Sequence, residues 1–448
     1  MASTKSVERD THRKALRINL DTNFYGTLAE IGAGQEVARW LFRAGGASGT
    51  VAKSISAYDM KVSDEIYGTS ARYVSRERLE QMLSREYDLL IRRLAEVRGG
   101  EVAFFAFADT VTARNYFGTN IPHGWVGLRF QTEPGGAVND LILHINLKDK
   151  TNLRQQQALG IFGINLIYAV FYLRDSLDDF LRSLLDALNV NRVEVDFIEL
   201  RGPAFEHVHP LAANIRLVRL GLAHAVVFRP DGSATEPLDV LYKRPVVIER
   251  GSFRSARPLF AQMLERSVRQ LAAETPEARR EPAAMLEISM DNILAKVSAD
   301  DIELLERIRR LNEMEQCVLL TDFRENYQLT EYLLHLTKSP IRLAMGIATL
   351  VQLFQETYYE TLDGGIVEAM GRLIARNVRI YAFNMDAERF RQRLAAFNLD
   401  LSFWDYPQSG TVTVENVLPK SHLRHFYTYL KEMQAFVPLE LPRQSKAD

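Results

Sequence analysis

Short apolar runs recur along the first half of the chain, and each is bounded by Gly, Asn, Asp or Pro. Runs of this length and composition predict strands. We expect them at residues 16–20, 27–31, 50–55, 102–107, 125–130, 141–147 and 193–200. Residues 76–98 instead carry apolar side chains three or four positions apart, which predicts an amphipathic helix that ends at Gly99. Residues 158–173 are apolar all round but short for a bilayer span, so they predict a buried helix.

The alternation of strand and helix is more regular in the second half. Strands are expected at residues 285–290, 318–323, 341–347 and 378–383, with helical segments between them. Strands joined through helices favour a parallel sheet that is covered on both faces. The pattern therefore predicts an α/β protein with mainly parallel or mixed sheets, helical crossovers and two domains.

The length of 448 residues exceeds what one hydrophobic core usually serves. We expect a polar N-terminal arm at residues 1–15 and an N-terminal α/β domain at 16–235. Residues 236–284 are interpreted as a basic loop and helical connection, because the stretch around 229–257 shows little helical period. A C-terminal α/β domain that ends in helices would then occupy residues 285–448.

The composition limits the classes of binding partner that we expect. With 55 basic and 57 acidic residues there is no global field to attract nucleic acid or anionic lipid, so neither is expected as a partner. The single cysteine, Cys317, excludes an intramolecular disulfide and a thiolate metal cluster, and no metal site is predicted. The polar start lacks the apolar core of a secretory signal, which favours a cytoplasmic location.

The sharpest local motif follows the expected strand at residues 27–31. Glu30, Gly32, Gly34 and Gln35 form a glycine turn that leads into an amphipathic helix. In such a turn a ligand can approach bare backbone at a helix N-terminus, where unpaired N–H groups favour phosphate. The dinucleotide fingerprint would have a third glycine where Val37 stands. A turn that merely joins strand to helix is the alternative.

The same stretch from Glu30 to Gly34 resembles the first motif of the Rossmann-like methyltransferases. That resemblance implies S-adenosylmethionine as cofactor and makes Asp59, which follows the next strand, the candidate ribose ligand.

Basic residues elsewhere supply further candidates for an anion site. Lys53 follows a second glycine cluster, at residues 45–49, that runs into a strand rather than a helix and so is no Walker A motif. A second set lies in the loop region: Lys243, Arg244, Arg250, Arg254 and Arg257. Arginine forks bind phosphate bidentately, although solvated surface charge is the simpler explanation.

Two other groups of residues are weaker candidates for a binding or metal site. Glu206, His207 and His209 are close in sequence but do not match a structural metal set. Acidic residues at expected strand ends occupy positions where α/β proteins place ligand groups: Asp109, Asp149, Asp196, Asp322 and Glu325.

Residues 16–59 as a whole, with later phrases at 156–161, 239–243 and 251–254, resemble an uncharacterised bacterial family. Its members carry automatic labels of nicotinate-nucleotide adenylyltransferase or TonB-dependent receptor. The receptor label implies export, for which the sequence gives no sign. The adenylyltransferase label agrees with the fold class, but that family's H-x-G-H pair is missing, so no catalytic residue is carried over.

Three functional hypotheses remain open. The leading one is a nucleotide-like, phosphate-bearing ligand bound at the Gly32 turn with Lys53 and Arg254 as partners, in a cytoplasmic nucleotide-dependent transferase. The alternative is a non-enzymatic, self-assembling structural or interaction protein, a homo-oligomer in which the glycine turns are architectural. The third is an S-adenosylmethionine-dependent methyltransferase.

Overall fold

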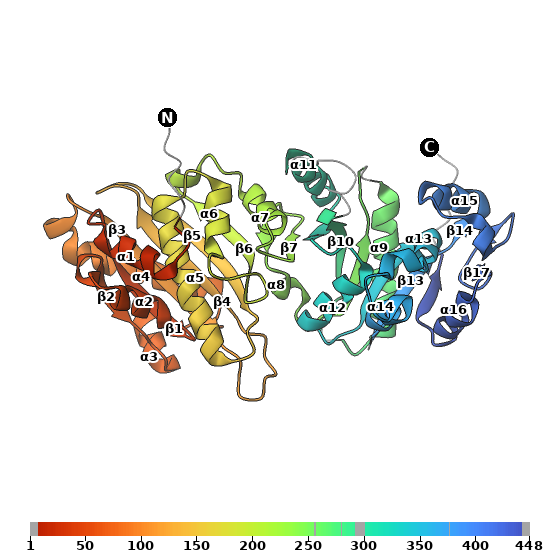
Figure 1. The fold of residues 1–448 in the computed structure, drawn as a ribbon, viewed down its shortest axis with the longest axis horizontal. Helices are drawn as coiled ribbons and strands as arrows, with labels where there is room; N and C mark the ends of the chain where they lie inside the picture. The colour runs from red at the N-terminus through yellow and green to blue at the C-terminus, as the bar shows by residue number, and fades with distance from the viewer. Residues whose placement is uncertain (1–7, 255–256, 279, 292–300, 376, 441–448) are drawn as a thin grey trace. The chain divides into compact units, whose positions relative to one another are not determined.

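The computed structural model describes residues 8–254, 257–278, 280–291, 301–375 and 377–440 (Figure 1). The chain divides into two compact units, Met1–Val226 and Val227–Asp448. Each unit is built on its own sheet with helical crossovers, and both sheets contain parallel and antiparallel pairs, which confirms the predicted α/β class.

The first unit contains a six-stranded sheet in the order β2-β1-β3-β4-β5-β6. Strands β2, β1 and β3 run parallel, and β4, β5 and β6 continue antiparallel from β3. The strands are β1 (Phe24–Gly32), β2 (Val51–Ile55), β3 (Ala103–Thr112), β4 (His123–Gln131), β5 (Val138–Leu147) and β6 (Val193–Arg201).

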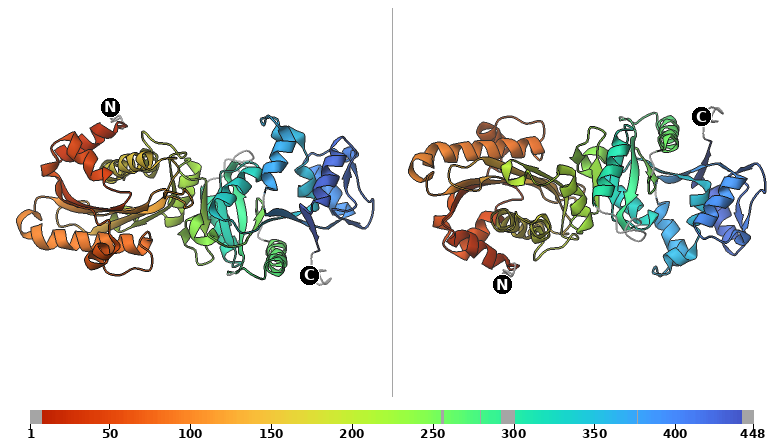
Figure 2. Two further views of the ribbon diagram at one scale, coloured as in Figure 1. Left: turned by 90° about the horizontal axis from the view of Figure 1, so that it is seen from below. Right: turned by 90° about the horizontal axis from the view of Figure 1, so that it is seen from above.

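Helices cover both faces of this sheet. Figure 2 shows α1, α2 and α5 on one face and the long α4 on the other. The helices are α1 (Thr11–Leu20), α2 (Glu36–Ala44), α3 (Met60–Tyr67), α4 (Arg76–Arg98), α5 (Asn152–Tyr172), α6 (Leu177–Leu184) and α7 (Pro210–Arg219), with short 3-10 turns at Ala47–Gly49 and Pro203–Phe205.

Close packing between α5 and α2 fixes the start of α2. A Cβ atom on Gly163 would lie 2.3 Å from a methyl group of Val37, and one on Gly160 would lie 2.6 Å from Cβ of Glu36. These glycines therefore let the two helices approach closely.

The expected strand at residues 16–20 is wrong, because this stretch is the end of α1. The buried positions of α1 include Lys14 as well as Ala15 and Ile18. Lys14 Nζ donates to Asn165 Oδ1 at 2.9 Å and to Asp186 Oδ2 at 2.8 Å. Because the charged residue Lys14 occupies a buried position, the apolar residues alone do not show the helical period of α1.

The second unit holds an eight-stranded sheet in the order β18-β13-β12-β9-β10-β11-β7-β8. Its strands are β7 (Ala225–Phe228), β8 (Ala234–Thr235), β9 (Val246–Arg250), β10 (Ala283–Ser289), β11 (Cys317–Thr321), β12 (Ile341–Gly346), β13 (Val378–Phe383) and β18 (Phe436–Leu439). The four strands expected here are β10 to β13, and the pairs β10·β11 and β12·β13 are parallel as predicted.

Residues 236–284, expected as a connection, contain β9, which lies between β10 and β12 in this sheet. The segment also contains α9, which packs on β9, β10 and β12. The helices of the unit are α8 (Pro237–Leu241), α9 (Pro258–Glu274), α11 (Asp301–Asn312), α12 (Asn326–Leu336), α13 (Ile347–Gln352), α14 (Gly365–Leu373), α15 (Ala387–Ala396) and α16 (Leu423–Glu432), with 3-10 turns at Glu356–Tyr359 and Leu401–Phe403.

Two small antiparallel ribbons complete the unit. Their strands are β14 (Met385–Asp386) with β16 (Thr411–Val412), and β15 (Trp404–Asp405) with β17 (Leu418–Pro419). The described part of the chain thus ends in helix α16 and strand β18 rather than in helices alone.

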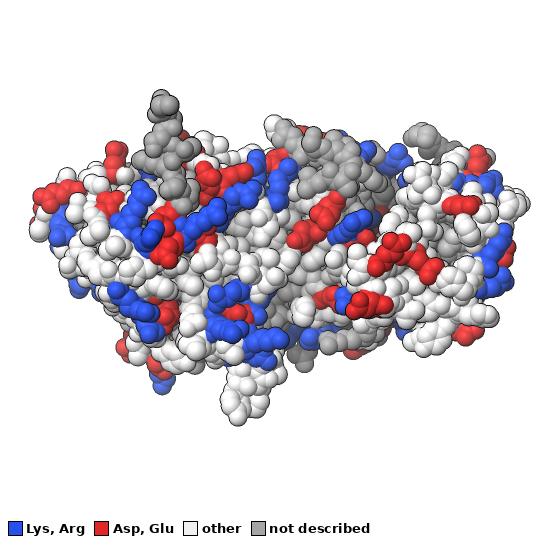
Figure 3. Space-filling view, in the orientation of Figure 1, with Lys and Arg blue, Asp and Glu red and all other residues white. Residues whose placement is uncertain are grey.

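Within the described residues no helix is both long and apolar enough to cross a bilayer. The apolar helix α5 is instead buried in the first unit, as predicted. On the face drawn in Figure 3, basic and acidic side chains are interspersed, in agreement with the near-zero net charge.

Candidate functional site

The glycine turn lies where the sequence places it, between β1 and α2. Gly32 has a φ of +80°, and a Cβ atom there would lie 2.2 Å from the backbone oxygen of Val111 on β3. The next residue, Ala33, donates its N–H to that same oxygen at 3.0 Å. Gly32 is therefore required by the close approach of two backbones within the protein.

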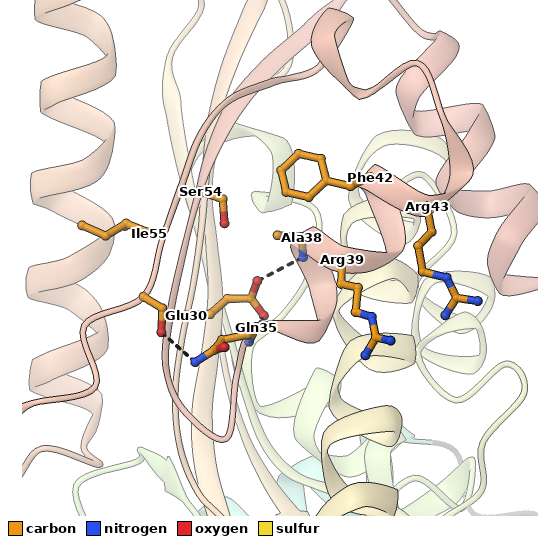
Figure 4. Close-up of a pocket in the computed structure, with 9 residues that line it drawn as sticks. Glu30, Gln35, Ala38, Arg39, Phe42, Arg43, Ser54 and Ile55 are labelled. Atoms are coloured by element: carbon orange, nitrogen blue, oxygen red, sulfur yellow. Dashed lines mark hydrogen bonds between the residues drawn. The ribbon is translucent and has the colours of Figure 1, made fainter.

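The N-terminus of α2 is occupied by a side chain of the same unit. One carboxylate oxygen of Glu30 accepts from the N–H groups of Gln35 at 2.6 Å and Val37 at 3.1 Å, and the other accepts from Ala38 at 3.0 Å (Figure 4). Free N–H groups at a helix start are what would attract a phosphate. Here Glu30 takes that position, so the turn itself is not an open phosphate cradle.

A second carboxyl group lies beside Glu30. Asp109 is its register partner on β3 and is fully buried. Burial, and after it the nearby charge of Glu30, raises the pKa of Asp109 well above its usual value. Burial likewise raises the pKa of Glu30, although its three backbone hydrogen bonds oppose the shift.

Gly34 is explained by this carboxyl pair. A Cβ atom at Gly34 would lie 2.4 Å from Oδ1 of Asp109 and 2.7 Å from Cβ of Glu30. Both oxygens of Asp109 are buried, and the backbone N–H of Ile31 only partly opposes the rise of its pKa. The second glycine thus makes room for a buried acid.

An open cavity of about 480 Å³ lies next to the carboxyl pair, between α2 and β2. Its size falls in the range of small-molecule sites, roughly 300 to 1,000 Å³. Its lining comes from the end of β1 and the turn, from α2, and from β2 with the residue after it: Glu30, Gln35, Ala38, Arg39, Phe42, Arg43, Ser54, Ile55 and Ser56.

The lining combines cationic, hydroxyl and aromatic groups. Arg39 and Arg43 are one helical turn apart on α2, and the Phe42 side chain is 55% exposed. In Figure 4 the Phe42 ring extends toward Ser54 on β2, while the two guanidinium groups point away from that ring. Gln35 Nε2 donates to Ser56 Oγ at 3.0 Å, which joins the turn to the end of β2.

Lys53 does not point into this cavity. Successive side chains of a strand alternate between faces. Ser54 and Ser56 face α2, whereas Lys53 forms an ion pair with Glu86 on α4, which covers the opposite face of the sheet. The Glu86 carboxylate also accepts from the Tyr67 hydroxyl at 2.9 Å.

Asp59, the candidate ribose ligand, caps a helix. Its Oδ1 accepts from the N–H groups of Lys61 at 3.0 Å and Val62 at 3.1 Å at the start of α3. It lies beyond the end of β2, which stops at Ile55.

The predicted basic set belongs to the second unit. Arg244 donates to the backbone oxygen of Glu281 at 2.9 Å, and Lys243 packs over the Tyr242 ring at 4.8 Å. Arg250 donates two hydrogen bonds to the Glu287 carboxylate, at 2.6 and 3.0 Å. Arg254 is exposed. These contacts are made within that unit, so the site described for the first unit does not include them.

Among the described residues there is no group of three His, Cys, Asp or Glu side chains placed to hold a metal ion. His209 instead caps α7, where its Nδ1 accepts from the N–H of Leu211 at 3.2 Å. Burial raises the pKa of the Cys317 thiol, which suits a partly buried strand residue.

Reasoning from the sequence found the turn but missed the cavity residues on α2. Arg39, Phe42 and Arg43 occupy positions i, i+3 and i+4, so they share one side of the helix. This spacing is visible in the sequence, and it predicts that two arginines and an aromatic ring lie together on the exposed side of the helix.

Comparisons with known proteins identify neither a family nor an activity for this chain. No protein-family model and no curated protein matches the chain. A competence/damage inducible protein, CihA, from Agrobacterium tumefaciens is 21% identical, with a TM-score of 0.27 over 36% of this chain and 94% of that one. A CinA superfamily protein from Enterobacter cloacae is 14% identical, with a TM-score of 0.27 over 38% of this chain and 99% of that one. At TM-scores this low the likeness supports no inference about activity or site residues.

Proposed function

We propose that the first unit binds a small, nucleotide-like ligand that carries a phosphate, in the cavity between α2 and β2. The observation that carries the proposal is the stripe of Arg39, Phe42 and Arg43 beside the hydroxyl groups of Ser54 and Ser56. Two guanidinium groups suit a phosphate, an exposed ring suits a base, and serine hydroxyls suit a sugar. The ligand class is the one expected from the sequence, but its place is beside the glycine turn.

The arginine side chains are free to reach the ligand by rotation. Arg39 pairs with Glu36 at 2.9 Å on the helix surface, and Arg43 packs over the Trp40 ring at 5.5 Å. Exposed ion pairs of this kind contribute only about 0 to 1 kcal/mol, so a bound phosphate can compete for the guanidinium groups. Closure of Arg39 and Arg43 over the cavity is thus part of the proposal.

The Glu30 contacts favour a second candidate, the structural or interaction protein. If the glycines serve only to pack Glu30 and Asp109, the turn has no need of a ligand. In that case the cavity is a surface hollow, and neither nucleotides nor S-adenosylmethionine will stabilise the chain.

A thermal-shift measurement separates the two candidates. We expect at least one of ATP, NAD, nicotinate mononucleotide and S-adenosylmethionine to raise the melting temperature. A ligand at a hundred times its dissociation constant stabilises the folded state by about 2.7 kcal/mol. Absence of a shift with all four at millimolar concentration favours the structural candidate.

The site is tested with the double variant Arg39→Ala/Arg43→Ala. It should reduce the shift from a phosphate-bearing ligand by most of its value, because each charge-assisted bond contributes about 1.5 to 3 kcal/mol. The matched control is Arg92→Ala/Arg93→Ala, which removes the same charge from the exposed face of α4. Equal shifts in the two double variants would place the ligand elsewhere.

A further inference from the structure

A line of hydrogen-bonded polar side chains crosses strands β4, β5 and β6 of the first unit. His123 Nδ1 lies 2.9 Å from His144 Nε2, and His144 Nδ1 lies 2.6 Å from Asp196 Oδ1. The second oxygen of Asp196 accepts from Asn146 Nδ2 at 2.7 Å. An acid, an inner imidazole and an outer imidazole are thus connected in sequence.

This line lies on the face of the sheet away from the α2 cavity. His123 and Arg129 are six residues apart on β4 and so share a face, and Arg129 Nη1 donates to Ser84 of α4 at 2.8 Å. Glu30, by contrast, caps α2 on the opposite face. The two places are therefore separate.

With both imidazoles neutral, the hydrogen bonds determine which nitrogen carries each proton. A carboxylate only accepts, so His144 donates from Nδ1 to Asp196, and its Nε2 becomes an acceptor. His123 must then donate from Nδ1 to His144. The lone pair of His123 Nε2 is left at the outer end of the line.

Only that outer end can meet a ligand. His144 and Asp196 are buried, and Trp125 packs edge-on against the His144 ring with centroids 5.0 Å apart. His123 begins β4 and is partly exposed. The inner residues can act on a ligand only through the His123 ring.

A cationic side chain stands at the same edge. Thr110 of β3 donates its hydroxyl to the backbone oxygen of Tyr73 at 2.6 Å, so the segment before α4 crosses this edge next to the exposed Arg72. Burial, then His144, then Arg72 lower the pKa of His123 to about 3, which keeps its ring neutral. Arg76, which packs over the Phe197 ring, is engaged with Glu80 and Glu199.

We propose that His123 is the general base of a second site, which takes a small anion that bears an acidic O–H or N–H group and is held by Arg72. The ligand's O–H or N–H bond breaks and its proton binds Nε2, which leaves one further negative charge on the ligand. The resulting imidazolium keeps its Nδ1 bond to His144, and Asp196 stabilises the positive charge through that ring. Asp196 is a positioning residue. An anion at Arg72 also offsets the charge that opposes protonation of His123, so the base gains basicity when the ligand arrives.

The first test uses diethyl pyrocarbonate on the whole, unmodified chain. An unprotonated imidazole nitrogen attacks its carbonyl carbon, and the released proton and ethyl carbonate leave as ethanol and carbon dioxide. N-acetylhistidine in the same tube serves as standard, and its rate should fall about thirtyfold from pH 7.5 to pH 5, because an ordinary imidazole titrates near pH 6.5. Carbethoxylation of His123, followed by peptide mass spectrometry, should fall by less than about threefold, since its pKa lies below this window.

Two outcomes would overturn the proposal. Failure of His123 to react while N-acetylhistidine does would show that its Nε2 is closed to ligands. A rate that falls in parallel with the standard would show an ordinary imidazole. This test needs no substitution, so misfolding of a variant cannot obscure it.

The anion is tested with inorganic phosphate, which carries both charge and O–H. Millimolar phosphate should slow carbethoxylation of His123, and Arg72→Ala should remove this protection while Arg92→Ala retains it. Absence of protection in the unmodified chain would refute the anion site. Asp196→Asn should slow the reaction by about tenfold or more, as loss of an orienting partner does elsewhere. Asn146→Ala, which spares the bond from His144 to Asp196, should slow it less.

Discussion

Asp109 shows most clearly how a single residue can shape the stability of the first unit. Its carboxyl group is fully buried next to Glu30, and burial outweighs the opposing effect of the nearby Ile31 backbone on its pKa. A folded state that raises the pKa of an acid holds its proton more tightly than the unfolded chain does. Stability is therefore greatest below the unfolded pKa and falls as the pH rises toward the raised one.

We predict that Asp109→Asn flattens this dependence. The variant cannot ionise, so its melting temperature should change less between pH 5 and pH 8 and should exceed that of the unmodified chain at pH 8. A gain of about 1 kcal/mol corresponds to roughly 2 to 4 °C in a unit of this size.

Asp88→Asn is the control for charge, since Asp88 is exposed on α4. It should leave the pH dependence as it is. An equal loss of stability at both pH values in Asp109→Asn would contradict the prediction, because it would mean that the ionised form is the stabilised one.

At the scale of elements, the strand, turn and helix around Gly32 test whether the glycine is there for packing. Gly32 and Gly45 have similar φ angles, +80° and +82°, but only Gly32 faces a close backbone atom, whereas a Cβ at Gly45 meets nothing within 4 Å. Gly45→Ala should cost about 1 to 3 kcal/mol for the backbone alone, because φ +82° and ψ 161° define a region that is almost confined to glycine.

Gly32→Ala should cost at least about 1 to 3 kcal/mol more than Gly45→Ala, as overpacking of a close contact does. Urea unfolding of the two variants, monitored by circular dichroism, measures the difference. Equal losses of unfolding free energy in the two variants would show that the backbone near Val111 can move aside. Gly32 would then be required only for its backbone conformation.

The elements also show what the sequence could reveal. Regular strands such as β10 to β13 were predicted, because apolar runs and helical spacers repeat there. Helix α1 was not, because Lys14 and Asn19 occupy buried positions through hydrogen bonds to residues far along the chain. Strand β9 was missed for a related reason: its five residues lie among Pro, Gly and basic positions that look like loop.

The candidate site was half predictable. The glycine turn is encoded by a short sequence motif, and it was predicted from that motif. That Glu30 turns back onto the helix, and that Lys53 faces α4 while Ser54 faces α2, depends on strand register and on which helices cover each face. Local sequence does not encode those long-range contacts.

At the scale of the whole molecule, each unit has its own sheet and its own buried core. We predict that fragments 1–224 and 225–448 fold independently, with the cut placed before β7 so that the second sheet stays complete. Each should give one calorimetric transition, with a heat-capacity change of about 12 to 15 cal/mol/K per residue.

Loss of cooperative unfolding in either fragment would contradict this prediction. The same fragments allow the two proposed sites of the first unit to be studied without the second, because their residues all lie before Val226.

Glu30 carries a wider consequence for inference from motifs. Its carboxylate sits where a bound phosphate would sit and is held by the same kind of N–H groups. The unit thus carries its own tethered carboxylate at the helix start, and this group competes intramolecularly with any anion from solution. A motif search predicts an anion-binding site at this turn, whereas the Glu30 carboxylate of the same chain already occupies it.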